Sequence, residues 1–333
     1  MQQVKKILVI QTAFIGDAVL ASALLEHLHK HLPEATIDLL VRSGNEQLYT
    51  AHPFLRNVLV WHKKEAKYKN LLKLVKTVRS NQYDLVLNLQ RHAASALITV
   101  CAGAKATAGF DSTFLSRFYS HRTNHVIGKK GQPDYKHEID RCIELAKPWV
   151  PFERTLPKLY PTAQDFSFIE QYATKPFITI SPSSVWMTKQ VPMHVWSNFI
   201  GAVSGYEVFL LGGPGDVELC RSLAQQLPHV HVLAGKLTLL QSAALMSKAR
   251  MNYTNDSAPM HLCSSLNAPV TAVFCSTIPE FGFGPLSTVS SVVQVSENLS
   301  CKPCGVHGFS SCPARHFKCG NIETKQLLNT LPK

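Results

Sequence analysis

The chain has 333 residues, of which 45% are hydrophobic and 17% are charged. That length exceeds what one hydrophobic core usually organises, so we expect two domains of roughly 150 residues each. The 34 Lys and Arg residues outnumber the 22 Asp and Glu residues, and the net charge of +12 favours acidic partners such as phosphates, anionic lipids or nucleic acid.

The first half alternates short apolar runs rich in β-formers with segments of helical periodicity. This alternation predicts a parallel sheet with helices on both faces. The expected strands are 7–10, 37–41, 58–61 and 85–88, and the expected helices are 17–30, 69–80 and 138–147.

Four prolines interrupt the pattern, at 148, 151, 157 and 161. Proline resists both helix interiors and central strands, so we place an interdomain linker here, with domains at 1–160 and 161–333. The alternation then restarts, which predicts a second doubly wound α/β domain. Its expected strands are 177–180, 207–211, 230–232, 251–253 and 270–274, and its expected helices are 194–204, 217–227, 239–248 and 259–266.

In such sheets, ligands bind at the carboxyl ends of strands, close to helix N-termini. Residues 255–261 (NDSAPMH) follow an expected strand and begin a helix. Asp256 or Ser257 can cap that helix, the small residues Ser257 and Ala258 let a phosphate approach its free amides, and His261 can add a donor. Taken alone, this segment is better explained as an ordinary capped helix with a packed histidine.

Two further strand ends carry residues suited to the same ligand. Ser183 and Ser184, with Lys189 five residues later, offer hydroxyls, amides and one cation for a diphosphate. Glycines at 212, 213 and 215 precede Asp216, which can accept hydrogen bonds from a ribose or a base. Each also has a bland interpretation, a solvated lysine or a bare turn, but the three together predict a nucleotide site. The sequence lacks the Gly-x-x-x-x-Gly-Lys-Ser/Thr loop, which argues against an ATPase. It also lacks a Gly-x-Gly-x-x-Gly motif after the first strand, which argues against a dehydrogenase.

In the first half, Gly16 allows a tight turn and Asp17 stands at the expected helix start. Asp17 can be a simple N-cap, a general base that takes a proton from an acceptor hydroxyl, or both. Basic residues also follow the strands of this half, and they are either a solvated face or a surface for an anionic acceptor. They are His62, Lys63, Lys64, Arg117, Arg122, Lys129 and Lys130, the last four in a stretch expected to be rich in loops.

Taken together, these motifs resemble glycosyltransferase family 9, the ADP-heptose:lipopolysaccharide heptosyltransferases, over essentially the whole chain. The NDSAPMH segment is the most specific of them. The resemblance implies a GT-B fold, in which two Rossmann-like domains face an interdomain cleft. It also implies inverting transfer of a heptose from ADP-heptose to the inner core of lipopolysaccharide.

The resemblance also assigns roles residue by residue. Asp17 would be the catalytic base and Lys189 would stabilise the leaving group without a metal. The donor would be held by Ser183, Ser184, Lys189, Asp216 at the ribose, Leu237 at the adenine, Asp256, Ser257, Ala258 and His261. The acceptor would meet His62, Lys63, Lys64, Arg117 and Arg122. Ala258 stands where the family most often has glycine, and Asp216 where it has the longer glutamate.

Four of the nine cysteines, Cys301, Cys304, Cys312 and Cys319, lie in the C-terminal tail. Their spacing suits a thiol-packed loop, which we favour, or structural zinc, disulfides or a redox function. The odd total points to reduced thiols in the cytoplasm. Residues 1–25 imitate a signal peptide, but Asp17 would interrupt its apolar core, so we expect them in the mature fold.

We therefore expect a glycosyltransferase peripheral to the cytoplasmic face of the inner membrane, with no bound cofactor, metal or nucleic acid. The sequence contains no run of about 18 uncharged apolar residues, so we do not expect a membrane-spanning helix. The alternatives are a GT-B enzyme using another nucleotide sugar, such as an epimerase, and a noncatalytic nucleotide- or nucleic-acid-binding protein. The sequence contains no recognisable nucleic-acid-binding module, which argues against the last of these alternatives.

Overall fold

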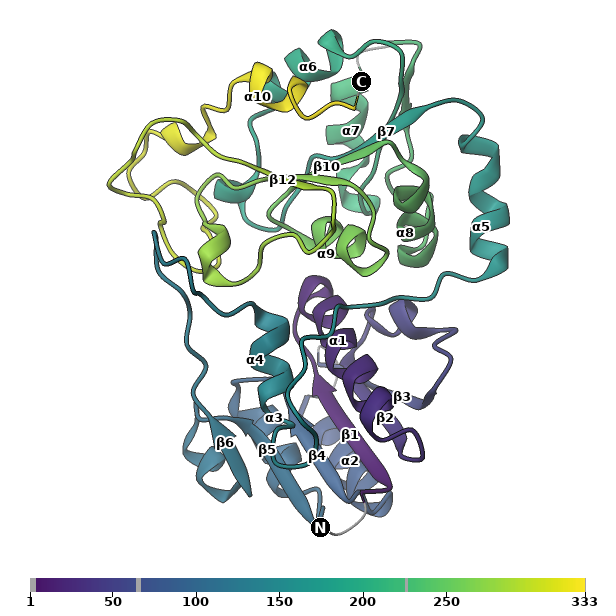
Figure 1. Ribbon diagram of the computed structural model, residues 1–333, viewed down its shortest axis with the longest axis vertical. Coiled ribbons are helices and arrows are strands. Elements are labelled where there is room, and N and C mark those ends of the chain that lie inside the picture. Colours follow the sequence, from purple (N-terminus) through teal and green to yellow (C-terminus); the bar gives the residue numbers. More distant parts are fainter. Residues whose placement is uncertain (1–3, 64–66, 225–226, 333) are drawn as a thin grey trace. The chain divides into compact units, whose positions relative to one another are not determined.

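The computed structural model describes residues 4–63, 67–224 and 227–332. The chain divides into two compact units, and each is described by itself (Figure 1). Unit 1 comprises Met1–Val126 and Glu138–Tyr160, and unit 2 comprises Ile127–His137 and Pro161–Lys333. The division between Tyr160 and Pro161 falls at the end of the proline-rich stretch. The segment Ile127–His137 belongs to unit 2, although it lies in the first half of the sequence.

Unit 1 contains a six-stranded parallel sheet among the described residues, in the order β3-β2-β1-β4-β5-β6. Helices α1 and α4 pack together on one face, and α2 and α3 pack on the other (Figure 1). The strands are β1 (Lys6–Gln11), β2 (Thr36–Arg42), β3 (Leu55–Trp61), β4 (Leu85–Asn88), β5 (Ala106–Phe110) and β6 (His121–Thr123). The helices are α1 (Ile15–His31), α2 (Lys67–Ser80), α3 (Ala93–Val100) and α4 (Glu138–Glu144), with 3-10 turns η1 (Glu46–Tyr49) and η2 (Phe114–Phe118).

Unit 2 repeats the design, with the strand order β12-β11-β10-β7-β8-β9 in the part of the chain that is described. All of its paired strands are parallel. The strands are β7 (Phe177–Ser181), β8 (Glu207–Leu210), β9 (Val230–Val232), β10 (Met251–Asn255), β11 (Val270–Val273) and β12 (Ser290–Val293). The helices are α5 (Ala163–Ile169), α6 (Met193–Ala202), α7 (Val217–Ala224), α8 (Leu239–Lys248), α9 (Ala258–Ser265) and α10 (Thr324–Leu328). The 3-10 turns are η3 (Glu170–Tyr172), η4 (Met187–Lys189), η5 (Pro214–Asp216), η6 (Pro279–Phe281) and η7 (Lys318–Gly320).

The predicted doubly wound α/β architecture is confirmed, because two parallel sheets are each flanked by helices on both faces. Strands β5, β6 and β12 and helices α3, α5 and α10 were not predicted. They are short, and β6 and β12 lie at sheet edges, where alternation is weak. Among the described residues, no helix combines the length and apolar character needed to cross a bilayer.

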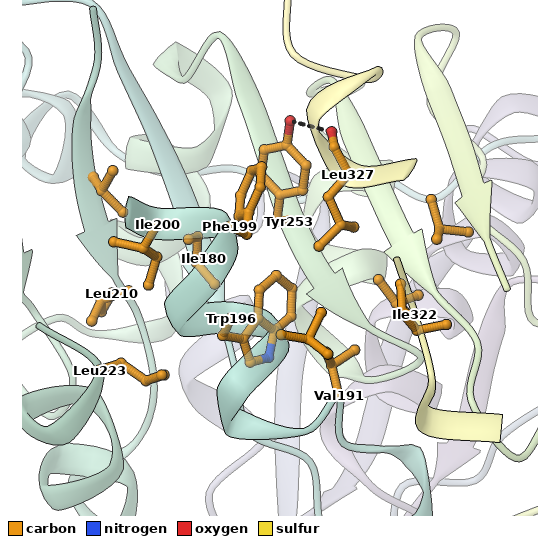
Figure 2. Packing of buried hydrophobic residues seen from close by; sticks show 14 of the residues in the cluster. Ile180, Val191, Trp196, Phe199, Ile200, Leu210, Leu223, Tyr253, Ile322 and Leu327 are labelled. Atoms are coloured by element: carbon orange, nitrogen blue, oxygen red, sulfur yellow. Dashed lines mark hydrogen bonds between the residues drawn. The ribbon is translucent and has the colours of Figure 1, made fainter. Parts of the chain in front are cut away.

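A large apolar cluster fills the face of the unit 2 sheet that α6, α7 and α10 cover (Figure 2). Trp196 and Phe199 of α6 are fully buried there, and the Phe199 ring lies 4.5 Å from the ring of Tyr253 on β10. Leu327 of α10 accepts a hydrogen bond from the Tyr253 hydroxyl through its carbonyl, at 3.4 Å. The C-terminal helix is thereby fixed to the central strand of the sheet.

We predict that Phe199→Ala lowers the free energy of unfolding by about 3 to 5 kcal/mol, because it opens a cavity in this core. Phe168→Ala, at a ring that is 40% exposed on α5, serves as the matched control and is expected to lose less than about 1 kcal/mol. Urea denaturation of both variants measures the difference. Equal losses would contradict the assignment of Phe199 to the core.

Candidate functional site

Strand β10 leads directly into the segment that the sequence singled out. The strand is buried along its whole length and extends to Asn255, two residues farther than predicted. Helix α9 begins at Ala258 after Ser257, with Pro259 in its first turn, where a missing amide proton breaks no hydrogen bond. The Met260 amide already donates to the Ser257 carbonyl at 3.1 Å, so the Ala258 amide is the one that the first turn of α9 offers to an anion.

Asn255 is a structural clamp at the carboxyl end of β10. Its Oδ1 accepts a hydrogen bond from the Val191 amide at 2.9 Å, and its Nδ2 donates to the carbonyls of Pro182 at 2.8 Å and Ser183 at 3.2 Å. The side chain thus fixes the loop after β7 on one side and the residues after η4 on the other. Asn255 is the first residue of the sequence motif, but the local pattern does not predict this role.

Lys189 and Asp256 form a close ion pair at 2.7 Å between Nζ and Oδ2. Both are largely shielded from water, with side chains 15% and 6% exposed. Thr277 donates a hydrogen bond from its hydroxyl to the same Oδ2 at 2.6 Å. The structure therefore pairs two residues to which the family resemblance gave roles at the donor, Lys189 at the diphosphate and Asp256 at the sugar and phosphates.

His261, the fourth residue of α9, lies near this ion pair. Burial lowers the pKa of His261 to about 4, with Asp256 opposing the shift and Lys189 reinforcing it. Its ring is only 5% exposed, and its Nδ1 has no hydrogen-bond partner among the described residues. At neutral pH the imidazole is uncharged, so it can offer one donor and one acceptor but no positive charge.

Ser183 and Ser184 follow β7 and are half-buried. Their backbone is held from two sides, because the Gln190 side-chain amide donates to the Ser184 carbonyl at 2.6 Å while Asn255 holds Ser183. Within the described part of the chain, neither side-chain hydroxyl has a hydrogen-bond partner. Both hydroxyls can therefore form hydrogen bonds with a ligand.

The loops after β8 and β9 are joined to each other. The Gly235 amide donates to the Gly212 carbonyl at 2.9 Å, and Leu237 follows, half-buried, just before Thr238 caps α8. Asp216 Oδ2 accepts a hydrogen bond from the Gly213 amide at 2.7 Å. A Cβ at position 212 would approach the Cβ of Asp216 to 2.7 Å, so the turn itself requires glycine at this position.

In unit 1, helix α1 begins at Ile15, two residues before the predicted start, and Phe14 is its N-cap residue. The interpretation of Asp17 as an N-cap is therefore wrong, and Gly16 lies in the first helical turn, not in a tight turn before it. Asp17 is the third helical residue and is half-buried. Asp17 lies near Cys142 of α4. Burial raises the pKa of that thiol, and the negative charges of Glu138 and Asp17 raise it further.

Lys63 is the member of the predicted acceptor set that reaches the loop preceding Asp17. Its Nζ donates to the Thr12 carbonyl at 2.7 Å, and burial, aided by Arg42, lowers its pKa. Arg42 lies over the exposed Phe14 ring, with 5.2 Å from its guanidinium carbon to the ring centroid. Arg42 was missed by the sequence analysis, although its place at the end of β2 was a usable signal.

Of the other predicted acceptor residues, Lys64 lies outside the described residues, and His62 is exposed after β3. Arg117 stacks on Phe114 at 3.3 Å, and Arg122 lies 3.8 Å from Asp111. Because β3 and β6 are opposite edges of the sheet, the described members of the predicted set form two separate basic groups.

The loop-rich stretch that carries Arg117 and Arg122 also contains the short strand β6, in which Arg122 lies. The segment with Lys129 and Lys130 belongs to unit 2, where Lys130 Nζ contacts the Asn298 side chain at 2.8 Å. The reason is tertiary: β6 pairs with β5, and the residues after it leave the sheet of unit 1.

All nine cysteines are described, and all have free thiols. In the C-terminal tail, the Phe317 amide donates to Cys312 Sγ at 3.4 Å, and Cys319 is buried. The described residues contain no group of three or more His, Cys, Asp or Glu placed to hold a metal ion. The zinc interpretation of Cys301, Cys304, Cys312 and Cys319 thus gains no support from this arrangement.

We predict that Asn255→Asp lowers the free energy of unfolding by about 3 kcal/mol, because a carboxylate oxygen would replace Nδ2 against two carbonyl oxygens. The matched control is Asn267→Asp, at an exposed residue whose Oδ1 accepts from the Thr288 amide at 2.8 Å. Aspartate keeps that acceptor, so the control should change by less than about 0.5 kcal/mol. If chemical denaturation gives the same value for both, Asn255 is not a clamp.

Comparison with known proteins places these features in a family. The chain is 26% identical over 283 residues to lipopolysaccharide heptosyltransferase 3 of Escherichia coli, covering 79% of this chain and 82% of that protein. It is 23% identical over 312 residues to the lipopolysaccharide core heptosyltransferase OpsX of Haemophilus influenzae, covering 90% and 87%. The solved structure of Escherichia coli ADP-heptose LPS heptosyltransferase II superposes with a TM-score of 0.79 at 22% identity, covering 98% of this chain and 97% of that one, and shows the same GT-B fold.

The model of glycosyltransferase family 9 (heptosyltransferase) matches residues 71–311. This range begins within α2 of unit 1 and extends through the Lys189–Asp256 pair into the cysteine tail. Since it spans well over half of the sequence, the chain belongs to glycosyltransferase family 9 and is a glycosyltransferase.

Proposed function

We propose that this enzyme transfers a heptose from ADP-heptose to the inner core of lipopolysaccharide, with inversion at the anomeric carbon. Membership of the family supports the reaction class, and the names of its relatives support the substrates. The observation that carries the proposal is the shielded Lys189–Asp256 pair beside the start of α9, at the carboxyl end of a parallel sheet.

The donor half of the reaction needs positive charge where ADP leaves. As the glycosidic bond to the diphosphate breaks, negative charge develops on the phosphate oxygens. Lys189 and the positive N-terminal end of the α9 dipole supply preorganised positive charge in a poorly solvated place, where electrostatic stabilisation is strongest. Ser183, Ser184, Ser257 and the neutral His261 add hydrogen bonds to phosphate or sugar oxygens, and Ala258 leaves room for them.

The nucleoside half of the donor fits the linked loops after β8 and β9. One carboxylate oxygen of Asp216 is engaged by its own turn, which leaves the other for a ribose hydroxyl. Leu237 offers an apolar surface to the adenine. Asp256, held by Lys189 and Thr277, would contact the sugar through its second oxygen.

The acceptor half needs a base and a surface for an anion. Asp17 takes the proton from the acceptor hydroxyl as that oxygen attacks the anomeric carbon, and ADP departs with the bonding electrons. Arg42 ends β2 and Lys63 follows β3, and both lie beside the loop that precedes Asp17, so they suit the negative charges of a lipopolysaccharide core. His62, Lys64, Arg117 and Arg122 supply the rest of the basic surface.

We further infer that the enzyme works at the cytoplasmic face of the inner membrane as a peripheral protein. Its net charge of +12 supports this, because each basic residue close to an anionic bilayer adds about 1 kcal/mol of attraction. The acceptor is itself anchored in that membrane by its lipid.

We predict that Asp17→Asn lowers kcat by about 10²- to 10⁴-fold and leaves the affinity for ADP unchanged, because the variant loses the base without altering the donor site. The assay is mass spectrometry of the product formed from ADP-heptose and a set of truncated lipopolysaccharide acceptors. Asp134→Asn, at an exposed residue of unit 2, is the control. Normal turnover by Asp17→Asn removes the base assignment, and transfer from a different nucleotide sugar redefines the donor.

We predict that Lys189→Met weakens ADP binding by about 10- to 100-fold, the usual worth of a hydrogen bond to a charged group. Isothermal titration calorimetry with ADP measures it. The variant also leaves Asp256 buried without its partner, so Lys189→Met with Asp256→Asn is measured alongside. If this double variant is stable and still binds ADP weakly, charge at position 189 is the cause. Lys325→Met, an exposed lysine on α10, should bind ADP normally.

A further inference from the structure

The C-terminal cysteine loop, residues 301–320, has no role in the proposed chemistry. In the structure it returns to the carboxyl end of the unit 2 sheet. Lys302 Nζ donates to the Phe274 carbonyl at 2.6 Å, and the Cys304 amide donates to the Ser276 carbonyl at 3.0 Å. Lys302 is 6% exposed, and burial lowers its pKa. The first turn of the loop is therefore anchored just after β11.

The middle of the loop reaches Thr188, the residue before Lys189. The Thr188 amide donates to the Phe309 carbonyl at 3.1 Å, and the Phe309 amide donates back to Thr188 Oγ1 at 2.8 Å. The Ser276 hydroxyl donates to the same Oγ1 at 3.1 Å. Thr188 is 1% exposed. One buried hydroxyl thus connects the cysteine loop, the end of β11 and the turn η4.

The loop also touches Lys189 itself. Gly308 has φ of +81°, and a Cβ at this position would lie 3.1 Å from Thr188 Oγ1 and 3.2 Å from both Lys189 Cγ and Trp186 Cβ. Glycine permits both the backbone conformation and the close approach. The aliphatic stem of Lys189 is therefore packed directly beneath the loop, while its ammonium group meets Asp256.

The ends of the loop are held by its own thiols. The Phe317 amide donates to Cys312 Sγ, and Cys301 Sγ lies 3.8 Å from His316 Nε2. Cys319 is buried in the apolar cluster of unit 2. These contacts join residues of the loop to one another and to the core of unit 2, so they restrict the conformations that the loop can adopt.

We propose that the cysteine loop positions Lys189 for the leaving diphosphate, and that Thr188 is the positioning residue through which it acts. The inference rests on the proposed function of Lys189. A lysine side chain is long and flexible, and a supporting shell that restricts it keeps the charge where the phosphate charge develops. The loop supplies that shell from a segment more than 100 residues away in sequence.

The first test compares Thr188→Val with Thr188→Ser. Valine keeps the volume but removes both hydrogen bonds to Oγ1, so we expect the Kd for ADP and the KM for the donor to rise about tenfold. The KM for the acceptor should stay unchanged. Serine keeps the oxygen and should restore values to within about threefold of wild type. Such a rescue, confined to the donor, is not expected from a merely structural residue.

Thr179→Val is the matched control for the first test. Thr179 is fully buried in β7, and its hydroxyl donates to Asn252 Oδ1 at 2.6 Å. This variant loses a buried hydrogen bond in the same unit without touching η4. Its thermal stability should fall while its affinity for ADP remains that of wild type.

The second test places a methyl group in the loop. Gly308→Ala should press on Thr188 and Lys189 and weaken ADP binding about tenfold. Gly305→Ala is its control, because a Cβ there would meet the Phe309 ring at an ordinary 3.5 Å. This pair keeps the proposal testable if Thr188→Val does not fold.

The outcomes separate the two proposals. If Lys189→Met weakens ADP binding but folded Thr188→Val and Gly308→Ala bind ADP like wild type, the positioning role is overturned and the proposed function stands. If Lys189→Met binds ADP normally, the assignment of Lys189 to the donor fails and the positioning role fails with it. Weakened binding in Thr188→Val and Gly308→Ala, with normal binding in both controls, supports the proposal.

Discussion

The buried amide of Asn255 is the interaction on which the unit 2 site depends. In a parallel sheet, the carboxyl ends of all strands meet at one edge, so their loops must be kept apart and in register. Asn255 does so from the central strand β10, because one side chain can accept from Val191 while donating to Pro182 and Ser183. Neither aspartate nor an apolar residue offers both a donor and an acceptor here.

The Lys189–Asp256 pair shows what this scaffold makes possible. Removing two charges from water is unfavourable, and their attraction compensates only when the geometry is good and further hydrogen bonds are made. Thr277 provides one such bond, and the Thr188–Phe309 contacts fix the turn that carries Lys189. His261 stays neutral beside the pair because burial lowers its pKa. The result is a single oriented cation whose counterion is already in place.

Unit 1 presents a different environment, with more positive charge. Arg42 ends β2 and Lys63 follows the neighbouring strand β3, and both lie beside the loop that leads into α1. Arg117 and Arg122 lie near the other edge of the sheet. Proximity of Arg42 contributes to lowering the pKa of Lys63, as expected when two cations share a poorly solvated place. An anionic acceptor would relieve that repulsion, which fits the proposed division of labour between the units.

The sequence by itself determined the two doubly wound units and the position of the 255–261 segment, because strand and helix periodicity depend on which side chains of one element are buried. It did not reveal the clamp role of Asn255, the start of α1 at Ile15, or the proximity of Arg42 to Lys63. Only the tertiary structure decided those features and the Thr188–Phe309 contact. Each depends on strand order and loop path, which bring together residues far apart in the chain, and no local pattern records that.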